Sequence, residues 1–133
     1  MYNGNILVVQ SGGSTAVINS SLSGIIREAR ERFPLSRILG ANYGIEGIIS
    51  SNLIDLTNIS EYKLTSLDET TGAALGSTRH KILPNDMDPI LDALRKHEIR
   101  MIHIIGGNDS AETALEISKT ASHANHDLIV INV

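Results

Sequence analysis

Residues 5–14 read N-I-L-V-V-Q-S-G-G-S, a short apolar run that stops at a pair of glycines. The run is rich in β-branched residues and too short for an ordinary helix, which favours a strand buried on both faces. Over residues 15–32, apolar side chains then recur at helical spacing. Phe33-Pro34 ends this helix, because a residue before proline avoids the helical conformation. The stretch therefore predicts a strand, a glycine turn and a helix.

The same alternation continues along the chain. We expect strands over residues 37–41, 101–105 and 128–133, a brief edge strand over 53–56, and helices over 44–50, 84–97 and 110–124. Pro84 would lie in the first turn of its helix, with Leu91 and Leu94 facing inward. Such alternation implies right-handed βαβ units. The predicted fold class is α/β, a Rossmann-like three-layer αβα sandwich with a mainly parallel sheet, formed as one domain by residues 1–133.

Composition excludes several classes of partner. A chain of 133 residues with 41% hydrophobic and 20% charged residues is globular. The net charge of −4 argues against binding to nucleic acid or to an anionic membrane. No apolar run approaches the roughly 18 residues that span a bilayer. The chain has no cysteine, which excludes thiolate metal sites and fits a cytoplasmic location.

The densest basic cluster lies in the first predicted helix. Arg27, Arg30 and Arg32 alternate there with Glu28 and Glu31. Alternating charges of this kind are typical of a solvated helix face. We therefore expect this cluster to face solvent.

The pattern of an apolar run, two glycines and a helix occurs a second time. Residues 104–110 read I-I-G-G-N-D-S and precede the helix expected over 110–124. Glycines at such turns let backbone N–H groups approach an oxyanion, and the helix start adds unpaired donors. Ligands of open α/β sheets bind beyond the carboxyl ends of the strands. Two such turns predict a shared phosphate site, whereas one alone could merely connect a strand to a helix.

A phosphate at this site would need a positive partner. Neither turn matches the G-x-x-x-x-G-K-[ST] motif of a nucleotide-binding P-loop, and residues 12–19 contain no lysine. Arg79 closes the small-residue stretch 70–79, T-T-G-A-A-L-G-S-T-R, and its planar guanidinium suits phosphate oxygens. By itself a loop arginine is more often only solvated.

Three motifs occur in a fixed order. They are S-G-G at residues 11–13 followed by Asn19 and Leu22, G-S-T-R at 76–79, and I-G-G-N-D-S at 105–110. Each motif alone is weak evidence, but their order and spacing resemble the phosphofructokinase family over residues 5–133. The resemblance implies a glycolytic phosphotransferase of which this chain is the domain that binds the phosphoryl donor.

The resemblance also implies a role for each motif. Gly12 and Gly13 would approach the donor phosphate, and Arg79 would pair with its oxygens. The second glycine turn would hold the donor together with Mg²⁺, through Gly107, Asn108, Asp109 and Ser110. His80 matches a position near the donor, although an ordinary exposed loop histidine is the more common interpretation.

Two residues depart from the family pattern. Asp109 stands where ATP-dependent members have glycine, and a carboxylate there would repel the α-phosphate of a nucleotide while leaving room for pyrophosphate. The resemblance is therefore to the pyrophosphate-dependent branch, with ATP as the alternative donor. Asn108 stands where the family has a magnesium-binding aspartate, and an amide oxygen brings no charge. Either Asp109 takes over that role or the metal is held mainly by pyrophosphate, so Asn108 and Asp109 are both candidate metal ligands.

The resemblance places the catalytic base and most of the fructose 6-phosphate site beyond Val133, so we expect no catalytic residue and no acceptor domain within these 133 residues. The chain alone would be inactive, and a homo-oligomer is expected from the family. The alternative is a non-catalytic domain that binds a phosphate-containing ligand or a partner chain. The NAD and diacylglycerol kinases share a G-G-D-G signature but lack the 76–79 element. Ending on an apolar strand should also leave apolar surface exposed.

Overall fold

The computed structural model describes residues 4–10, 16–69, 75, 82–106 and 108–133. Within these residues the strands are β1 (Asn5–Gln10), β2 (Ile38–Ala41), β3 (Leu53–Asp55), β4 (Ile99–Ile105) and β5 (Ile129–Asn132). The helices are α1 (Ala16–Arg32), α2 (Ile45–Ile49), α3 (Glu61–Glu69), α4 (Met87–Lys96) and α5 (Asn108–His123), with a 3₁₀ turn η1 (Pro84–Asp86) before α4.

The strands form one sheet in the order β3-β2-β1-β4-β5. β1 pairs in parallel with β2 on one side and with β4 on the other, and β4 pairs in parallel with β5. Only the pairing of β2 with the edge strand β3 is antiparallel among the described strands. The central β1 is buried on both faces, as its uninterrupted apolar run predicts.

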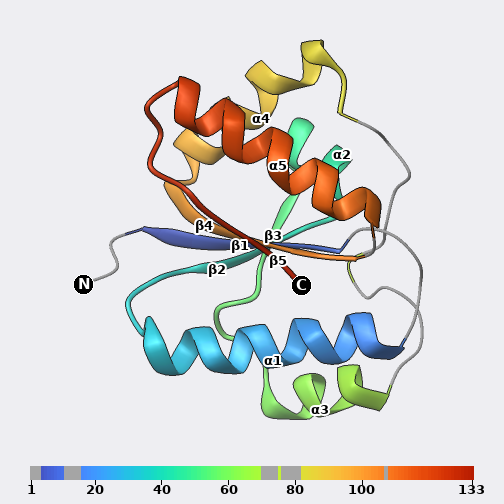
Figure 1. Cartoon of the computed structure of the whole chain (residues 1–133). Helices are drawn as coiled ribbons and strands as arrows, with labels where there is room; N and C mark the ends of the chain where they lie inside the picture. Colours follow the sequence, from blue (N-terminus) through green and yellow to red (C-terminus); the bar gives the residue numbers. More distant parts are fainter. Residues whose placement is uncertain (1–3, 11–15, 70–74, 76–81, 107) are drawn as a thin grey trace.

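Helices cover both faces of the sheet, with α1 and α3 on one face and α2, α4 and α5 on the other (Figure 1). The side chains of β1 alternate between two core clusters, as the two-residue period of a strand requires. Ile6 and Val8 pack in the cluster that includes Leu22 and Ile26 of α1. Leu7 and Val9 pack in the cluster formed with α2, α4 and α5. The predicted three-layer α/β architecture is confirmed.

The expected elements agree closely with the observed ones, and one helix was not predicted. α3 lies where the sequence shows no clear apolar period, yet Leu64 within it is completely buried. This helix packs against α1 and closes the same core cluster. Tertiary packing therefore stabilises a helix that local propensity does not predict.

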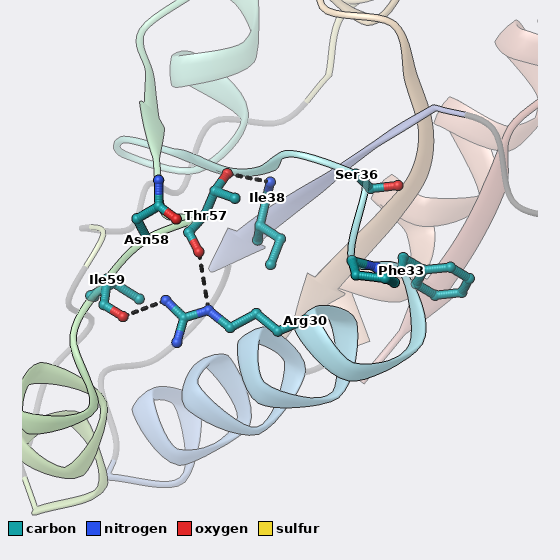
Figure 2. Close-up of a pocket in the computed structure, with 8 residues that line it drawn as sticks. Arg30, Phe33, Ser36, Ile38, Thr57, Asn58 and Ile59 are labelled. Carbon is teal, nitrogen blue, oxygen red and sulfur yellow. Dashed lines mark hydrogen bonds between the residues drawn. The ribbon is translucent and has the colours of Figure 1, made fainter.

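The expectation of a solvated basic face on α1 is wrong for Arg30. Its side chain is partly buried and donates hydrogen bonds to the backbone carbonyls of Thr57 and Ile59, with an Nε–oxygen distance of 3.1 Å to Thr57 (Figure 2). These bonds hold the segment between β3 and α3 against the end of α1. Arg32, by contrast, is exposed and pairs with Glu28 one turn earlier. Arg30 therefore has a structural role that the charge pattern does not reveal.

The apolar strand β5 lies at the edge of the sheet and is largely exposed. Ile129, Ile131 and Val133 are 49%, 36% and 47% exposed. Next to them an apolar groove of about 460 Å³ runs between α1 and the β4–β5 side of the sheet, with Ile25, Phe33, Met101 and His103 in its lining. The expected exposure of apolar surface near residue 133 is thus confirmed.

Candidate functional site

The two central strands β1 and β4 end side by side. Gln10, the last residue of β1, is the register partner of Ile105, the last residue of β4. From these ends the chain continues to α1 on one face of the sheet and to α5 on the other, and both helices start at the same edge (Figure 1). This is a topological switch point, where open α/β sheets bind ligands. The edge formed by these two strand ends is therefore the candidate site.

The start of α5 is held against the end of β5. Ser110 is 1% exposed, and its hydroxyl donates a hydrogen bond to Oδ1 of Asn132 at 2.9 Å. Backbone bonds continue this link, from Val133 N to Ile104 O at 2.8 Å and from Gly106 N to Val133 O at 3.2 Å. The amino end of a 16-residue helix is thus fixed at the carboxyl edge of the sheet. The dipole of the helix favours an anion at this end.

A buried glutamine connects the end of β1 with two other segments. Gln10 is completely buried, and its Nε2 donates to Oδ1 of Asn19 in α1 at 3.1 Å. Its Oε1 accepts a hydrogen bond from the backbone N–H of Leu75 at 2.7 Å. The carbonyl of Leu75 in turn accepts a bond from the N–H of Tyr43 at 2.8 Å. Leu75 is therefore held at the carboxyl edge of β1 and β2, four residues before Arg79.

The side chain of Leu75 packs over a glycine of β2. It is 7% exposed and belongs to the core cluster on the α1 face. A Cβ added at Gly40 would lie 3.0 Å from both methyl carbons of Leu75 and 2.9 Å from Cδ1 of Leu56. Glycine at position 40 thus leaves the space that Leu75 fills.

The structure describes only part of the predicted site. Gly12, Gly13, Arg79 and Gly107 lie outside the described residues, as does His80. Asn108 and Asp109 form the first turn of α5, and their side chains are outside the description. Ser110 is placed at the predicted edge, where its hydroxyl proton is engaged by Asn132. A phosphate could use that proton only if Ser110 exchanged this partner.

Three residues at this edge were not predicted as part of the site: Gln10, Leu75 and Asn132. Two of them carry a signal in the sequence. Gln10 is a polar residue at the end of a strand predicted to be buried on both faces, and such a residue needs partners. Leu75 is the one large apolar side chain in the small-residue stretch 70–79, which marks an anchor point. Asn132 shows no comparable signal.

A pocket of about 410 Å³ lies at the opposite edge of the sheet (Figure 2). Its lining includes Phe33, which follows α1, and Ile38, the first residue of β2. The N–H of Ile38 donates to the hydroxyl of Thr57 at 3.0 Å, and the guanidinium of Arg30 is engaged by backbone carbonyls. The Arg30 guanidinium and the N–H of Ile38 thus have partners within the protein, and the pocket lies apart from the candidate site.

The part of the chain that the structure describes contains no cluster of metal ligands and no membrane-spanning helix. No three His, Cys, Asp or Glu side chains in that part of the chain gather as a metal site would, and Asp109 lies outside that set. Over the same part of the chain, no helix is both long enough and apolar enough to cross a membrane.

Comparisons with known proteins agree with this geometry. A family model described as Phosphofructokinase matches residues 5–133. The chain is 41% identical to the pyrophosphate–fructose 6-phosphate 1-phosphotransferase of Xanthomonas campestris, covering all of this chain and 32% of that protein. It is 38% identical to the enzyme of the same name from Rhodospirillum rubrum, covering all of this chain and 33% of that protein.

A solved structure has the same fold. The pyrophosphate-dependent phosphofructokinase of Nitrosospira multiformis superposes with a TM-score of 0.92 at 33% identity, over 98% of this chain and 33% of that one. The chain thus spans about a third of the length of the relatives that it matches. Family match, sequence identity and fold lead to the same conclusion: the chain belongs to the phosphofructokinase family.

Proposed function

We propose that this chain forms the part of a pyrophosphate-dependent phosphofructokinase that binds the phosphoryl donor. The observation that carries the proposal is the pairing of Gln10 with Ile105, because it brings the starts of both glycine turns to one sheet edge. The amino end of α5 adds a positive dipole end at that edge. Both relatives with about 40% identity carry pyrophosphate in their names.

Pyrophosphate is the proposed donor because of Asp109. This residue lies in the first turn of α5, beside the second glycine turn. A carboxylate there would repel the α-phosphate of ATP, whereas pyrophosphate has only two phosphates to accommodate. The preference for pyrophosphate over ATP would then depend on the negative charge of Asp109.

The remaining site residues would position and neutralise the donor. Gly12, Gly13 and Gly107 would present backbone N–H groups to the phosphate oxygens, and Arg79 would form paired, charge-assisted hydrogen bonds with them. Phosphoryl transfer needs little covalent chemistry from the protein, so these contacts would act by alignment and charge stabilisation.

Mg²⁺ would offset the charge of the donor. Asn108 and Asp109 provide oxygen-bearing side chains at the start of α5, and Mg²⁺ prefers oxygen ligands while keeping several waters and donor oxygens. Asp109 would contribute the charged ligand, and Asn108 a neutral one.

The phosphoryl acceptor would be fructose 6-phosphate, as the names of the relatives state for those proteins. The family resemblance places the catalytic base and the acceptor site outside the 133 residues. Transfer would therefore require that further part, and the whole enzyme would be a homo-oligomer.

Calorimetric titration of the chain with Mg-pyrophosphate tests the proposal. The wild-type chain should bind, and Arg79→Ala should weaken binding by roughly 10- to 100-fold, as loss of charge-assisted hydrogen bonds predicts. Arg32→Ala is the matched control, because Arg32 is exposed at the far end of α1 and should not affect binding. A wild-type chain that binds neither Mg-pyrophosphate nor Mg-ATP would contradict the proposal.

A further inference from the structure

We infer that Gln10 is a positioning residue for donor binding, an inference that rests on the proposed function. Its buried side-chain amide sets Leu75 and the first turns of α1 against the end of β1, and thereby raises affinity for pyrophosphate.

Gln10 is a polar residue that lies in the core at the end of β1. The side chain is completely buried at the end of β1, and a buried amide is unfavourable unless its donor and acceptor find partners. Both ends of the amide have one: Asn19 accepts from Nε2, and the N–H of Leu75 donates to Oε1. Asn19 is itself completely buried in the first turns of α1. An apolar residue at position 10 would remove both of these buried hydrogen bonds.

The contacts of Gln10 extend across distant parts of the chain. Asn19 lies nine residues away and Leu75 lies 65 residues away. The helix after the first glycine turn and the segment before Arg79 are thus connected through a single side chain. Gln10 itself directly precedes that glycine turn. One amide therefore fixes the relative position of two segments that the proposed function assigns to the same phosphate.

Within the described part of the chain Leu75 is held in three ways, and the hydrogen bond to Gln10 ties its backbone N–H to the end of β1. The other two are the hydrogen bond from Tyr43 N and the packing of its side chain near Gly40 and Leu56. Removal of the amide would leave these two in place, so Leu75 would remain close to β2 but lose its link to the end of β1. A ligand would then have to order this segment as it binds, and that ordering lowers affinity.

A matched control lies at the other end of the same strand. The side chain of Asn5 also bridges two segments, because Nδ2 donates to the carbonyl of His97 at 2.8 Å and Oδ1 accepts from the N–H of Arg37 at 2.9 Å. Asn5 is at the amino end of β1, so its loss should lower stability without affecting the carboxyl edge. The isosteric changes Gln10→Met and Asn5→Leu remove one bridging amide each.

The test combines two measurements on the 133-residue chain. Amide hydrogen exchange followed by NMR should show faster exchange at Leu75 in Gln10→Met, and unchanged exchange there in Asn5→Leu. Titration with Mg-pyrophosphate should show affinity roughly tenfold lower in Gln10→Met, since net loss of one or two buried hydrogen bonds has this effect. Asn5→Leu should bind as the wild type does. If Gln10→Met fails to fold, Gln10→Asn replaces it, because its side chain is too short to reach both partners.

The outcomes separate this inference from the proposed function. Equal affinity in Gln10→Met and Asn5→Leu, or unchanged exchange at Leu75, overturns the positioning role while the proposed function stands. A wild-type chain that binds no pyrophosphate overturns both. Faster exchange together with weaker binding, confined to the position 10 variant, supports the inference.

Discussion

Gln10 and Ile105 are register partners, and each is the last residue of a central parallel strand. The Gly-Gly pair that begins at Gly106 directly follows Ile105, and the pair that begins at Gly12 follows Gln10 after one intervening residue. Because α1 and α5 then leave on opposite faces of the sheet, the paired strand ends lie at a switch point in the topology (Figure 1). The proposed donor site depends on this relationship.

Donor preference should depend on the charge at position 109. Asp109→Gly should raise the affinity for Mg-ATP relative to Mg-pyrophosphate by roughly tenfold, since repulsion of the α-phosphate is removed. Competitive titration with the two ligands measures this ratio. Asp127→Asn is the control, because it removes one negative charge from an exposed position before β5. An unchanged ratio in Asp109→Gly would rule out the role of this carboxylate.

Gly40 should be intolerant of a methyl group. In Gly40→Ala the new Cβ would lie about 3.0 Å from the methyl carbons of Leu75 and Leu56, and such overpacking costs about 1–3 kcal/mol in the free energy of unfolding. Gly24→Ala is the control, because nothing lies within 4 Å of a Cβ added at that helical position. That change should instead stabilise the chain by up to about 1 kcal/mol. Urea denaturation of both variants measures the two opposite effects.

Stability should fall as the pH drops below about 6.5. Burial lowers the pKa of His103 from its usual 6.5, and burial together with the charge of Lys96 lowers the pKa of His97. Between the lowered pKa and 6.5 the unfolded chain binds more protons, so the free energy of unfolding increases with pH in that window. Thermal denaturation at pH 7.5 and pH 5.5 should show a lower melting temperature at the acidic pH.

The variant His103→Phe isolates the contribution of that histidine. Its ring still fills the groove beside Met101 and Ile131, but it takes up no proton. The difference in melting temperature between the two pH values should therefore shrink. A variant that kept the full difference would show that His103 does not titrate as inferred.

A polypeptide of these 133 residues should bind the donor but transfer no phosphate to fructose 6-phosphate. Transfer requires donor and acceptor in line, and the chain corresponds to about a third of its relatives. A coupled assay for fructose 1,6-bisphosphate, with either donor, measures this. A longer relative such as the Rhodospirillum rubrum enzyme serves as the positive control. Turnover by the purified chain above background would contradict the expectation.

Much of the fold was predictable because its signals are local. The apolar runs of β1 and β4 and the helical period of α1 are each visible within a few residues. α3 was not predictable, since burial of Leu64 against α1 stabilises it. Arg30 was likewise misjudged, because its carbonyl partners lie 27 and 29 residues away.

The sequence alone determined the class of fold, the position of both Gly-Gly pairs along the chain and the resemblance to phosphofructokinases, since periodicity and motif order are properties of the linear chain. Only the tertiary structure decided that Gln10 lies beside Ile105 and accepts a hydrogen bond from the backbone of Leu75, 65 residues further along. Contacts of that kind depend on strand order and on which polar groups become buried together, and no local pattern encodes them.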